Sequence, residues 1–97
     1  MKEINTKQRA LLRSMANRLS PAIIVGKGGI TDNLIWQLDV ELEARELVKC
    51  TILKTALLDA KTLCNDLAEK LDANAVQAIG SKFVLYRESK ENKKIFL

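Results

Sequence analysis

Three segments of the chain carry hydrophobic residues at helical spacing, and each begins with a residue whose side chain can cap a helix. Thr6, Thr31 and Asp59 stand at these starts, and Ser20 and Pro21 end the first segment. The predicted helices span residues 6–19, 31–44 and 60–71. Their apolar faces contain Leu11, Leu12, Met15 and Leu19 in the first, Leu34, Ile35, Leu38 and Leu42 in the second, and Ala60, Leu63, Cys64, Leu67 and Leu71 in the third.

Four shorter segments have the composition or the alternation of β-strands. They are residues 22–25, 46–54, 75–79 and 82–87. Gly80 and Ser81 separate the last two, which predicts a hairpin with a two-residue turn. Phe83 and Tyr86 fall on opposite faces of the last strand, so we expect at most one of them in the core.

The predicted order is α-β-α-β-α-β-β, which is typical of an α/β fold. Two successive strand-helix-strand units favour parallel pairing through right-handed crossovers, and the hairpin adds an antiparallel strand. We therefore expect a two-layer domain with a four-stranded mixed sheet. At 97 residues the chain forms a single domain, residues 1–97, with a core of about residues 6–89 and a polar, frayed tail at residues 90–97.

The composition is that of a soluble globular protein, with 47% hydrophobic and 29% charged residues. The apolar runs are shorter than the about 18 to 20 residues that a membrane span needs. The first residues lack the apolar segment and cleavage site of a signal peptide, so we expect the mature protein to begin at or near Met1. A cytoplasmic, monomeric protein with no membrane partner is the expectation.

The side chains that usually perform catalysis or bind metals are scarce. The chain has no histidine, and its two cysteines, Cys50 and Cys64, are predicted to be small buried hydrophobes, with a redox pair as the alternative. Asp59 and Asp66 are interpreted as a helix cap and a solvated residue. We therefore expect no metal, no cofactor, no small-molecule substrate and no enzymatic activity.

Positive charge is concentrated in the first third of the chain. Residues 1–30 hold six basic residues and one acid, a net charge of +5, whereas residues 31–97 hold ten basic residues and eleven acids, a net charge of -1. Such asymmetry favours a polyanionic partner, and a basic helix face that is merely solvated is the alternative.

The basic third ends in a glycine-rich loop, "VGKGGIT", at residues 25–31. A Walker A loop needs its lysine directly before the capping Ser or Thr, and Lys27 comes too early. A dinucleotide fingerprint needs a third glycine where Thr31 stands. Both spacings argue against a bound nucleotide.

The remaining interpretation is a short G-x-x-G turn, as in KH-type loops, that lets a sugar-phosphate backbone approach closely. Lys27 would supply charge, and the helix that begins at Thr31 would direct its dipole at the same phosphate. A plain strand-to-helix turn is the alternative. We expect the loop and the basic first helix to form one phosphate-binding surface; its residues are Gly26, Lys27, Gly28, Gly29, Thr31, Lys7, Arg9, Arg13 and Arg18. Trp36 is interpreted as a rim residue, and Arg45 as an ion-pair partner of Glu41 or Glu46.

Three stretches, "LRSMANRLSPAIIVGKGGIT", "LEARELVKCTIL" and "VQAIGSKFVLYRES", resemble the YhbY-type proteins, the stand-alone bacterial form of the CRM (chloroplast RNA splicing and ribosome maturation) domain. The resemblance runs from about Thr6 to Ser89, in order and without large gaps. It is specific because the basic helix, the glycine loop and the hairpin all occur at the spacing of the family.

The resemblance implies a small RNA-binding protein that associates with precursors of the large ribosomal subunit and assists their assembly. It also implies a fold similar to the C-terminal domain of translation initiation factor three, with the loop and the first helix as the RNA-contacting surface. A hypothesis of another class is a protein-interaction module that docks its basic face on an acidic or ribosomal protein.

Overall fold

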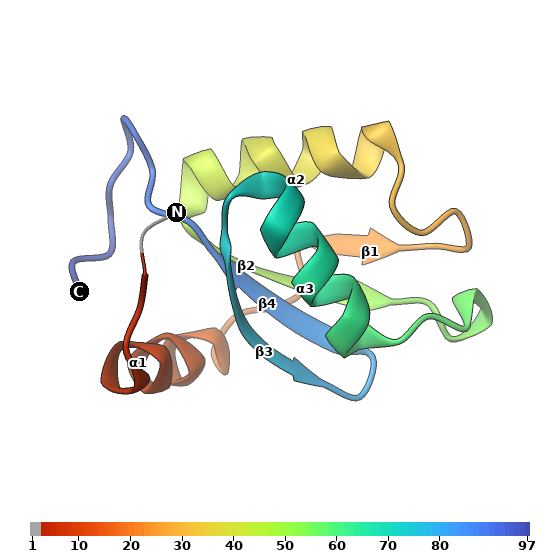
Figure 1. Cartoon of the computed structure of the whole chain (residues 1–97), viewed down its shortest axis with the longest axis horizontal. Coiled ribbons are helices and arrows are strands. Elements are labelled where there is room, and N and C mark those ends of the chain that lie inside the picture. Colours follow the sequence, from red (N-terminus) through yellow and green to blue (C-terminus); the bar gives the residue numbers. More distant parts are fainter. Residues whose placement is uncertain (1–2) are drawn as a thin grey trace.

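The computed structural model describes residues 3–97 and confirms the predicted α/β class, with three helices and a four-stranded mixed sheet (Figure 1). A 3-10 turn, η1, follows the second strand and was not predicted. The elements are α1 (Thr6–Ala16), β1 (Ile23–Val25), α2 (Asp32–Arg45), β2 (Leu47–Ile52), η1 (Lys54–Ala56), α3 (Ala60–Leu71), β3 (Asn74–Ile79) and β4 (Lys82–Tyr86).

The strands lie in the order β1-β2-β4-β3. The unit β1-α2-β2 pairs in parallel, as predicted, and β4 runs antiparallel to both of its neighbours. The predicted pairing of β2 with β3 is wrong, because β4 lies between them. Residues 83–86 of β4 are all buried, on both faces, so this strand belongs at the centre of the sheet rather than at an edge.

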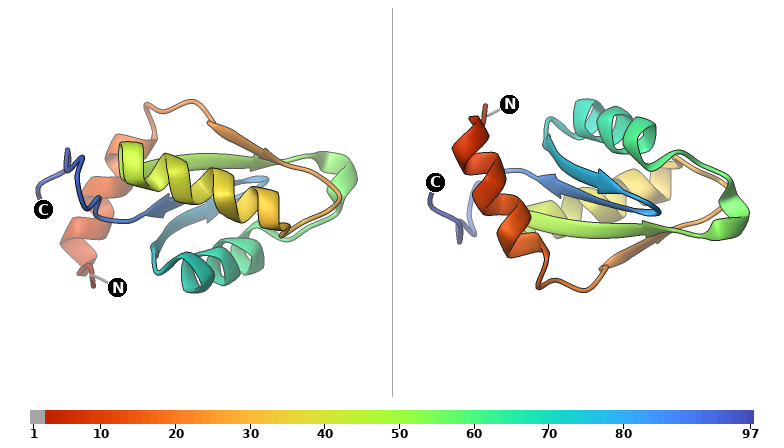
Figure 2. Two further views of the ribbon diagram at one scale, coloured as in Figure 1. Left: turned by 90° about the horizontal axis from the view of Figure 1, so that it is seen from above. Right: turned by 90° about the horizontal axis from the view of Figure 1, so that it is seen from below.

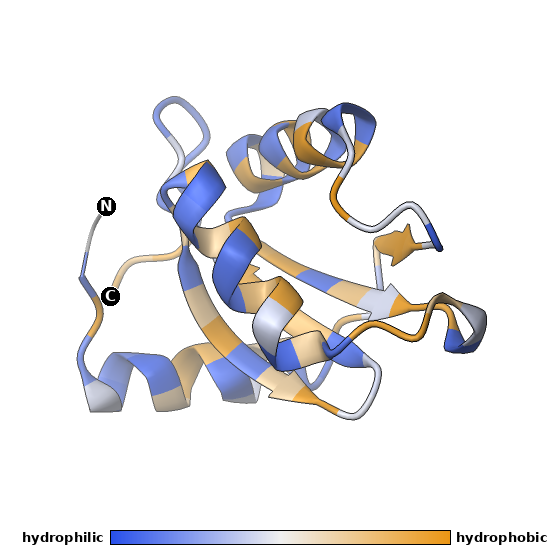
Figure 3. Ribbon diagram, turned by 45° about the vertical axis from the view of Figure 1, so that its right-hand side comes forward, coloured by the Kyte–Doolittle hydropathy of each residue, from blue (hydrophilic) through white to orange (hydrophobic). Residues whose placement is uncertain are grey.

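The main core lies between α2, α3 and one face of the sheet, and hydrophobic and hydrophilic residues alternate along these helices (Figure 3). The predicted apolar residues of α3 are all buried, and those of α2 are buried or half-buried. Thr31 and Asp59 cap these helices as expected, since their side chains accept the backbone N–H groups of Leu34 and Thr62. The sequence pattern therefore placed both helices correctly.

Helix α1 covers part of the opposite face of the sheet and adds a partial third layer to the predicted two-layer arrangement (Figure 2). Leu12 and Ala16 pack there against Leu47, Val84 and Tyr86. Tyr86 and Phe83 are both 0% exposed. The expectation that at most one of these rings is buried is wrong, because each face of β4 has its own cover.

The bounds and the buried face of α1 differ from the prediction. Asn5, not Thr6, caps the helix in a reciprocal capping box with Gln8: each backbone N–H donates to the other side chain, at 2.8 and 3.0 Å. The helix ends at Ala16, not at Leu19. Of the predicted apolar stripe only Leu12 is buried, because the helix touches the sheet along the narrow seam of residues 12 and 16.

The C-terminal residues are held against the domain, so the expectation of a frayed tail at residues 90–97 is wrong. Glu46 is 0% exposed, and its carboxylate accepts the backbone N–H groups of Ser89, Lys94 and Ile95 at 2.7, 2.6 and 2.7 Å. Ile95 is buried beside Leu12 and Tyr86. Charge-assisted hydrogen bonds to one buried acceptor thus order a segment whose own composition is polar.

Candidate nucleic-acid interface

The glycine loop forms a β-turn directly after β1. The backbone N–H of Gly29 donates to the carbonyl oxygen of Gly26 at 3.1 Å, which leaves Lys27 and Gly28 at the exposed central positions. Two residues later, Oγ1 of Thr31 accepts the N–H of Leu34 at 3.1 Å and starts α2. The turn therefore presents Lys27 at its tip, close in sequence to a helix N-terminus.

The three glycines of the turn are not equally required by the fold. Gly29 alone among them has a positive φ, +63°, which L side chains rarely adopt. A Cβ on Gly26 would lie at an ordinary 3.8 Å from Cδ1 of Leu53, and one on Gly28 at a tight 3.2 Å from the methyl group of Thr31. The conformation of the folded chain therefore does not require glycine at position 26. What this glycine does provide is a backbone open to close approach.

A shallow hollow of about 220 Å³ lies beside the turn, between β1 and the first turns of α2. The amide side chains of Asn33 and Gln37 line it together with Gly26 and Gly28, and its lining contains no carboxylate. These two amides were not predicted as site residues. The sequence does contain a signal for them: they are four residues apart in a helix that begins at the loop, so they lie on the same side of α2.

The four predicted basic residues of α1 and its extension have different surroundings. Lys7, Arg13 and Arg18 are exposed, whereas Arg9 is half-buried and its Nη1 donates to the carbonyl oxygen of Ala75 in β3. Arg9 therefore ties α1 to the edge of the sheet, a structural role that the sequence did not indicate. Lys2, which contributes to the basic N-terminal charge, lies outside the described residues.

The basic helix and the glycine loop lie at opposite ends of the sheet (Figures 1 and 2). Helix α1 packs near the start of β2, at Leu47, whereas the turn lies past the end of the parallel strand β1, near Leu53. The helix and the loop therefore do not form the predicted surface by direct contact. An uncovered part of the sheet lies between them.

The structure shows the surroundings of Arg45 and Trp36, two residues whose roles the sequence did not decide. The Nε of Arg45 lies 2.8 Å from Oε2 of Glu41, so Arg45 forms one of the two predicted ion pairs. Trp36 is 64% exposed on α2 within the described residues, so most of it is open to solvent.

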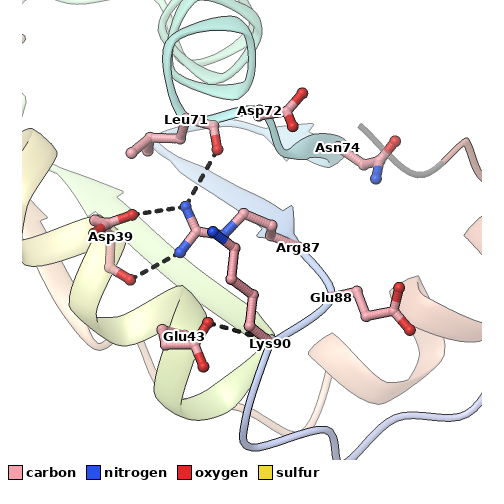
Figure 4. A pocket seen from close by; sticks show the side chains of 8 residues that line it. All are labelled: Asp39, Glu43, Leu71, Asp72, Asn74, Arg87, Glu88 and Lys90. Carbon is pink, nitrogen blue, oxygen red and sulfur yellow. Dashed lines mark hydrogen bonds and ion pairs between the residues drawn. The ribbon is translucent and has the colours of Figure 1, made fainter.

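Another hollow, of about 470 Å³, is lined by more acidic than basic residues (Figure 4). It lies where α2 and α3 meet the start of the C-terminal segment, residues 87–97. Nη1 of Arg87 lies 2.8 Å from Oδ1 of Asp39 and donates to the carbonyl oxygen of Leu71 at 3.2 Å, which joins the two helices. The carboxylates in the lining outnumber the bases; they are Asp39, Glu43, Asp72 and Glu88, against Arg87 and Lys90. This side of the molecule is unfavourable for a polyanion.

The two cysteines lie in the main core and form no disulfide. Burial raises the pKa of Cys50 to about 12 and that of Cys64 to about 11, so both thiols stay protonated at neutral pH. Within residues 3–97, no group of three or more histidine, cysteine or acidic side chains is placed to hold a metal ion. The same residues include no helix with the length and apolar character that a membrane crossing needs.

A four-stranded mixed sheet whose edge strand leads through a G-x-x-G turn into a helix defines the class of this protein, a small α/β domain. The CRS1 / YhbY (CRM) domain pattern matches residues 4–87. The chain belongs to this family, as the resemblance predicted.

Individual relatives agree with this assignment. The chain is 46% identical over 91 residues to the Probable RNA-binding protein YqeI of Bacillus subtilis, covering 94% of this chain and 95% of that protein. It is 30% identical over 93 residues to an RNA-binding protein of Haemophilus influenzae, covering 96% and 94% of the two chains. The solution structure of the hypothetical protein SAV1595 from Staphylococcus aureus, described as a candidate RNA-binding protein, superposes with a TM-score of 0.82 at 46% identity, covering 98% of this chain and 99% of that one.

Proposed function

We propose that this protein is a non-enzymatic RNA-binding protein that holds backbone phosphates at the G-x-x-G turn, with support from the exposed bases of α1. The observation that carries the proposal is Gly26, where the fold tolerates a Cβ, so that we attribute the glycine to close approach of a ligand to the backbone. Lys27 is exposed beside it, and the neighbouring hollow contains amides and no carboxylate. The relatives named as RNA-binding proteins support the same function.

Charge at the turn comes mainly from Lys27. The start of α2 contributes a positive dipole and backbone N–H donors, but Asp32 in the first helical turn offsets part of that attraction. Phosphate contacts of this kind position a protein on RNA and carry little sequence information. We therefore expect recognition of RNA shape and a steep dependence on salt.

We further propose that the RNA is ribosomal, within precursors of the large subunit, and that the protein acts as a cytoplasmic monomer that assists assembly. This finer proposal rests on the family to which the chain belongs. Crosslinking in cells, followed by sequencing of the attached RNA, should recover large-subunit precursor RNA. Recovery of other RNA classes alone would overturn the ribosomal part.

The turn itself is tested with Lys27→Ala and Gly26→Asp, measured by fluorescence anisotropy with a structured ribosomal RNA fragment. Lys27→Ala should reduce the salt slope of binding by about 1, and the carboxylate of Gly26→Asp should weaken binding about tenfold or more. Lys70→Ala, an equal loss of charge on α3, is the matched control and should bind like the wild type. Wild-type affinity in both loop variants, at every salt concentration, would exclude the turn as the site.

Docking on an acidic or ribosomal protein is a second candidate, which the exposed apolar residues of α1 and of the segment that follows it favour. Leu11, Met15 and Leu19 are exposed beside Arg13 and Arg18, a mixed surface typical of protein contacts. Absence of an RNA gel shift at low salt, together with capture of a ribosomal protein after nuclease treatment, would favour this candidate.

A further inference from the structure

The part of the sheet that α1 leaves uncovered has a regular arrangement that the strand register defines. Ile24 pairs with Thr51, Thr51 with Lys82, and Lys82 with Ile79, so these four residues form one row across all four strands. Paired residues point to the same face of a sheet. The row therefore lies on the face that α1 partly covers, at the end near the glycine loop.

A second row lies parallel to the first. Lys49 pairs with Val84, and Val84 with Gln77. A third pair, Leu47 and Tyr86, is the one that α1 covers. Helix α1 also buries Val84, which is 2% exposed, whereas Lys49 and Gln77 on either side of it are half-buried. The open rows are therefore the first row together with Lys49 and Gln77 of the second. Across four strands, at about 4.8 Å per strand, this face spans roughly 14 Å.

The accessible side chains of the open rows are apolar on the two edge strands and basic in the middle, where Lys82 is exposed and Lys49 is half-buried. Ile24 and Ile79, on the two edge strands, are 63% and 67% exposed. Lys49 and Lys82 lie on neighbouring strands in diagonal positions. Among the described residues neither lysine has an ion pair, and the two rows contain no carboxylate.

Two unpaired lysines on adjacent strands repel each other unless an anion lies between them. The arrangement is therefore suited to a negatively charged ligand. Ile24 lies two residues before Gly26, so the open rows continue directly into the proposed phosphate-binding turn. A polyanion held at the turn can extend onto this face without leaving the protein surface.

A hollow of about 200 Å³ lies on this face and is lined by residues of both rows and by Asn17, which follows α1. The amides of Asn17 and Gln77 line it, with Lys49, Lys82 and Ile79 around them. Amides both donate and accept, which matches the edges of a nucleobase. In an A-form duplex the bases are stacked and their major-groove edges lie too deep to reach, so only an unpaired nucleotide can place its base in this hollow.

We propose that the open sheet face is a second RNA contact, specific for unpaired nucleotides: Lys49 and Lys82 hold phosphates, and the hollow between Asn17 and Gln77 accepts one base. This inference rests on the RNA-binding function proposed above and deepens it by naming the class of RNA. The face connects the basic end of α1 with the glycine loop, which are otherwise separated.

The test compares binding of two probes, a fully paired RNA duplex and the same duplex with an unpaired extension. The wild type should prefer the extended probe. Lys49→Gln combined with Lys82→Gln should weaken binding of the extended probe at least about fivefold and lower its salt slope by about 1.4, the value for two contacts to a single strand, with little effect on the duplex. Gln77→Glu should also weaken binding of the extended probe.

The matched control is Lys61→Gln combined with Lys70→Gln, which removes the same charge from α3, on the other face of the sheet. Equal losses in the test and control pairs would overturn the proposal, because they would reflect net charge alone. Unchanged affinity of Lys49→Gln/Lys82→Gln, while Gly26→Asp weakens binding, would also overturn it but leave the proposed function standing. If neither Lys49→Gln/Lys82→Gln nor Gly26→Asp changed the affinity for RNA, the proposed function itself would be wrong. Thermal unfolding of each variant verifies that the fold is retained.

Discussion

Gly26 and Gly29 lie in the same turn but differ in what the fold requires of them. Gly29 has a φ of +63°, which only glycine adopts without strain, so this residue makes the turn possible. Gly26 meets only an ordinary van der Waals neighbour, Leu53, at its missing Cβ. Gly29 is therefore required by the fold, whereas Gly26 is not, which leaves the proposed ligand contact as the role of Gly26.

Alanine substitutions should separate these roles. Gly29→Ala should lower the free energy of unfolding by about 1 to 2 kcal/mol because of the positive φ, whereas Gly26→Ala should leave it unchanged or raise it slightly. Urea unfolding followed by circular dichroism measures both. RNA affinity should fall in Gly26→Ala despite its intact stability. Equal destabilisation by the two substitutions would contradict this assignment.

Helix α2 connects the proposed binding site with the C-terminal segment. Its first residues follow the glycine loop, and near its other end Glu43 and Glu46 accept the backbone N–H groups of the last residues. Glu46 has a φ of 68° at the C-cap of the helix, which is strained for a residue with a side chain. The three N–H donors around its carboxylate offset that strain.

These carboxylates predict an acid-sensitive attachment of residues 89–95. Hydrogen bonds, first from the Ser89 side chain and then from the backbone of Lys90 and Glu91, lower the pKa of Glu43 to about 2. Burial acts to raise the pKa of Glu46, but the backbone N–H groups outweigh it and the net shift is downward. Both pKa values are depressed in the folded state, so the stabilisation is complete above the ordinary value of 4.5 and is lost as the pH falls below it, for Glu43 down to its folded-state pKa of about 2.

The measurement is the pH dependence of the amide chemical shifts of Lys94 and Ile95, together with urea unfolding between about pH 6 and pH 3. The amides should move toward random-coil values, and the midpoint of unfolding should fall, as the solution is acidified. Glu43→Gln keeps the shape but removes one titrating group, so its stability should depend less on pH. A stability that does not change with pH in the wild type would argue against this attachment.

At the scale of the whole molecule, one sheet carries cores on both faces, and the two faces are covered to different extents. The face under α2 and α3 is closed, whereas the face under α1 and the C-terminal segment is open over the row that runs from Ile24 to Ile79 and, beside the buried Val84, at Lys49 and Gln77. Acidic residues gather where α2 and α3 meet the C-terminal segment (Figure 4), and Lys49 and Lys82 lie on the open rows. Charge is therefore distributed unevenly between these two sides of the molecule, as the proposed RNA contact requires.

The closed core predicts the behaviour of the two thiols. Cys50 and Cys64 are buried and have raised pKa values, so neither should react with a thiol-specific reagent in the native state. Labelling should require opening of the main core, and its rate should follow the equilibrium of global unfolding as urea is added. Rapid labelling of either cysteine in the absence of denaturant would show that this core opens locally.

The sequence by itself determined the local features of this protein. The caps at Thr31 and Asp59, the apolar faces of α2 and α3, the β3-β4 hairpin and the position of the glycine turn all depend on residues within a few positions of one another. Such short-range patterns survive in any tertiary context that keeps the element. The candidate residues of the turn were predicted for this reason.

Only the tertiary structure decided what long-range packing controls. It placed β4 between β2 and β3, turned Leu12 rather than Leu11 toward the sheet, and bound the C-terminal residues to Glu46. It also separated α1 from the glycine loop and aligned residues from four strands into the open rows between them. These contacts join residues far apart in the sequence, and their register depends on the burial of both sheet faces at once, which no local pattern encodes.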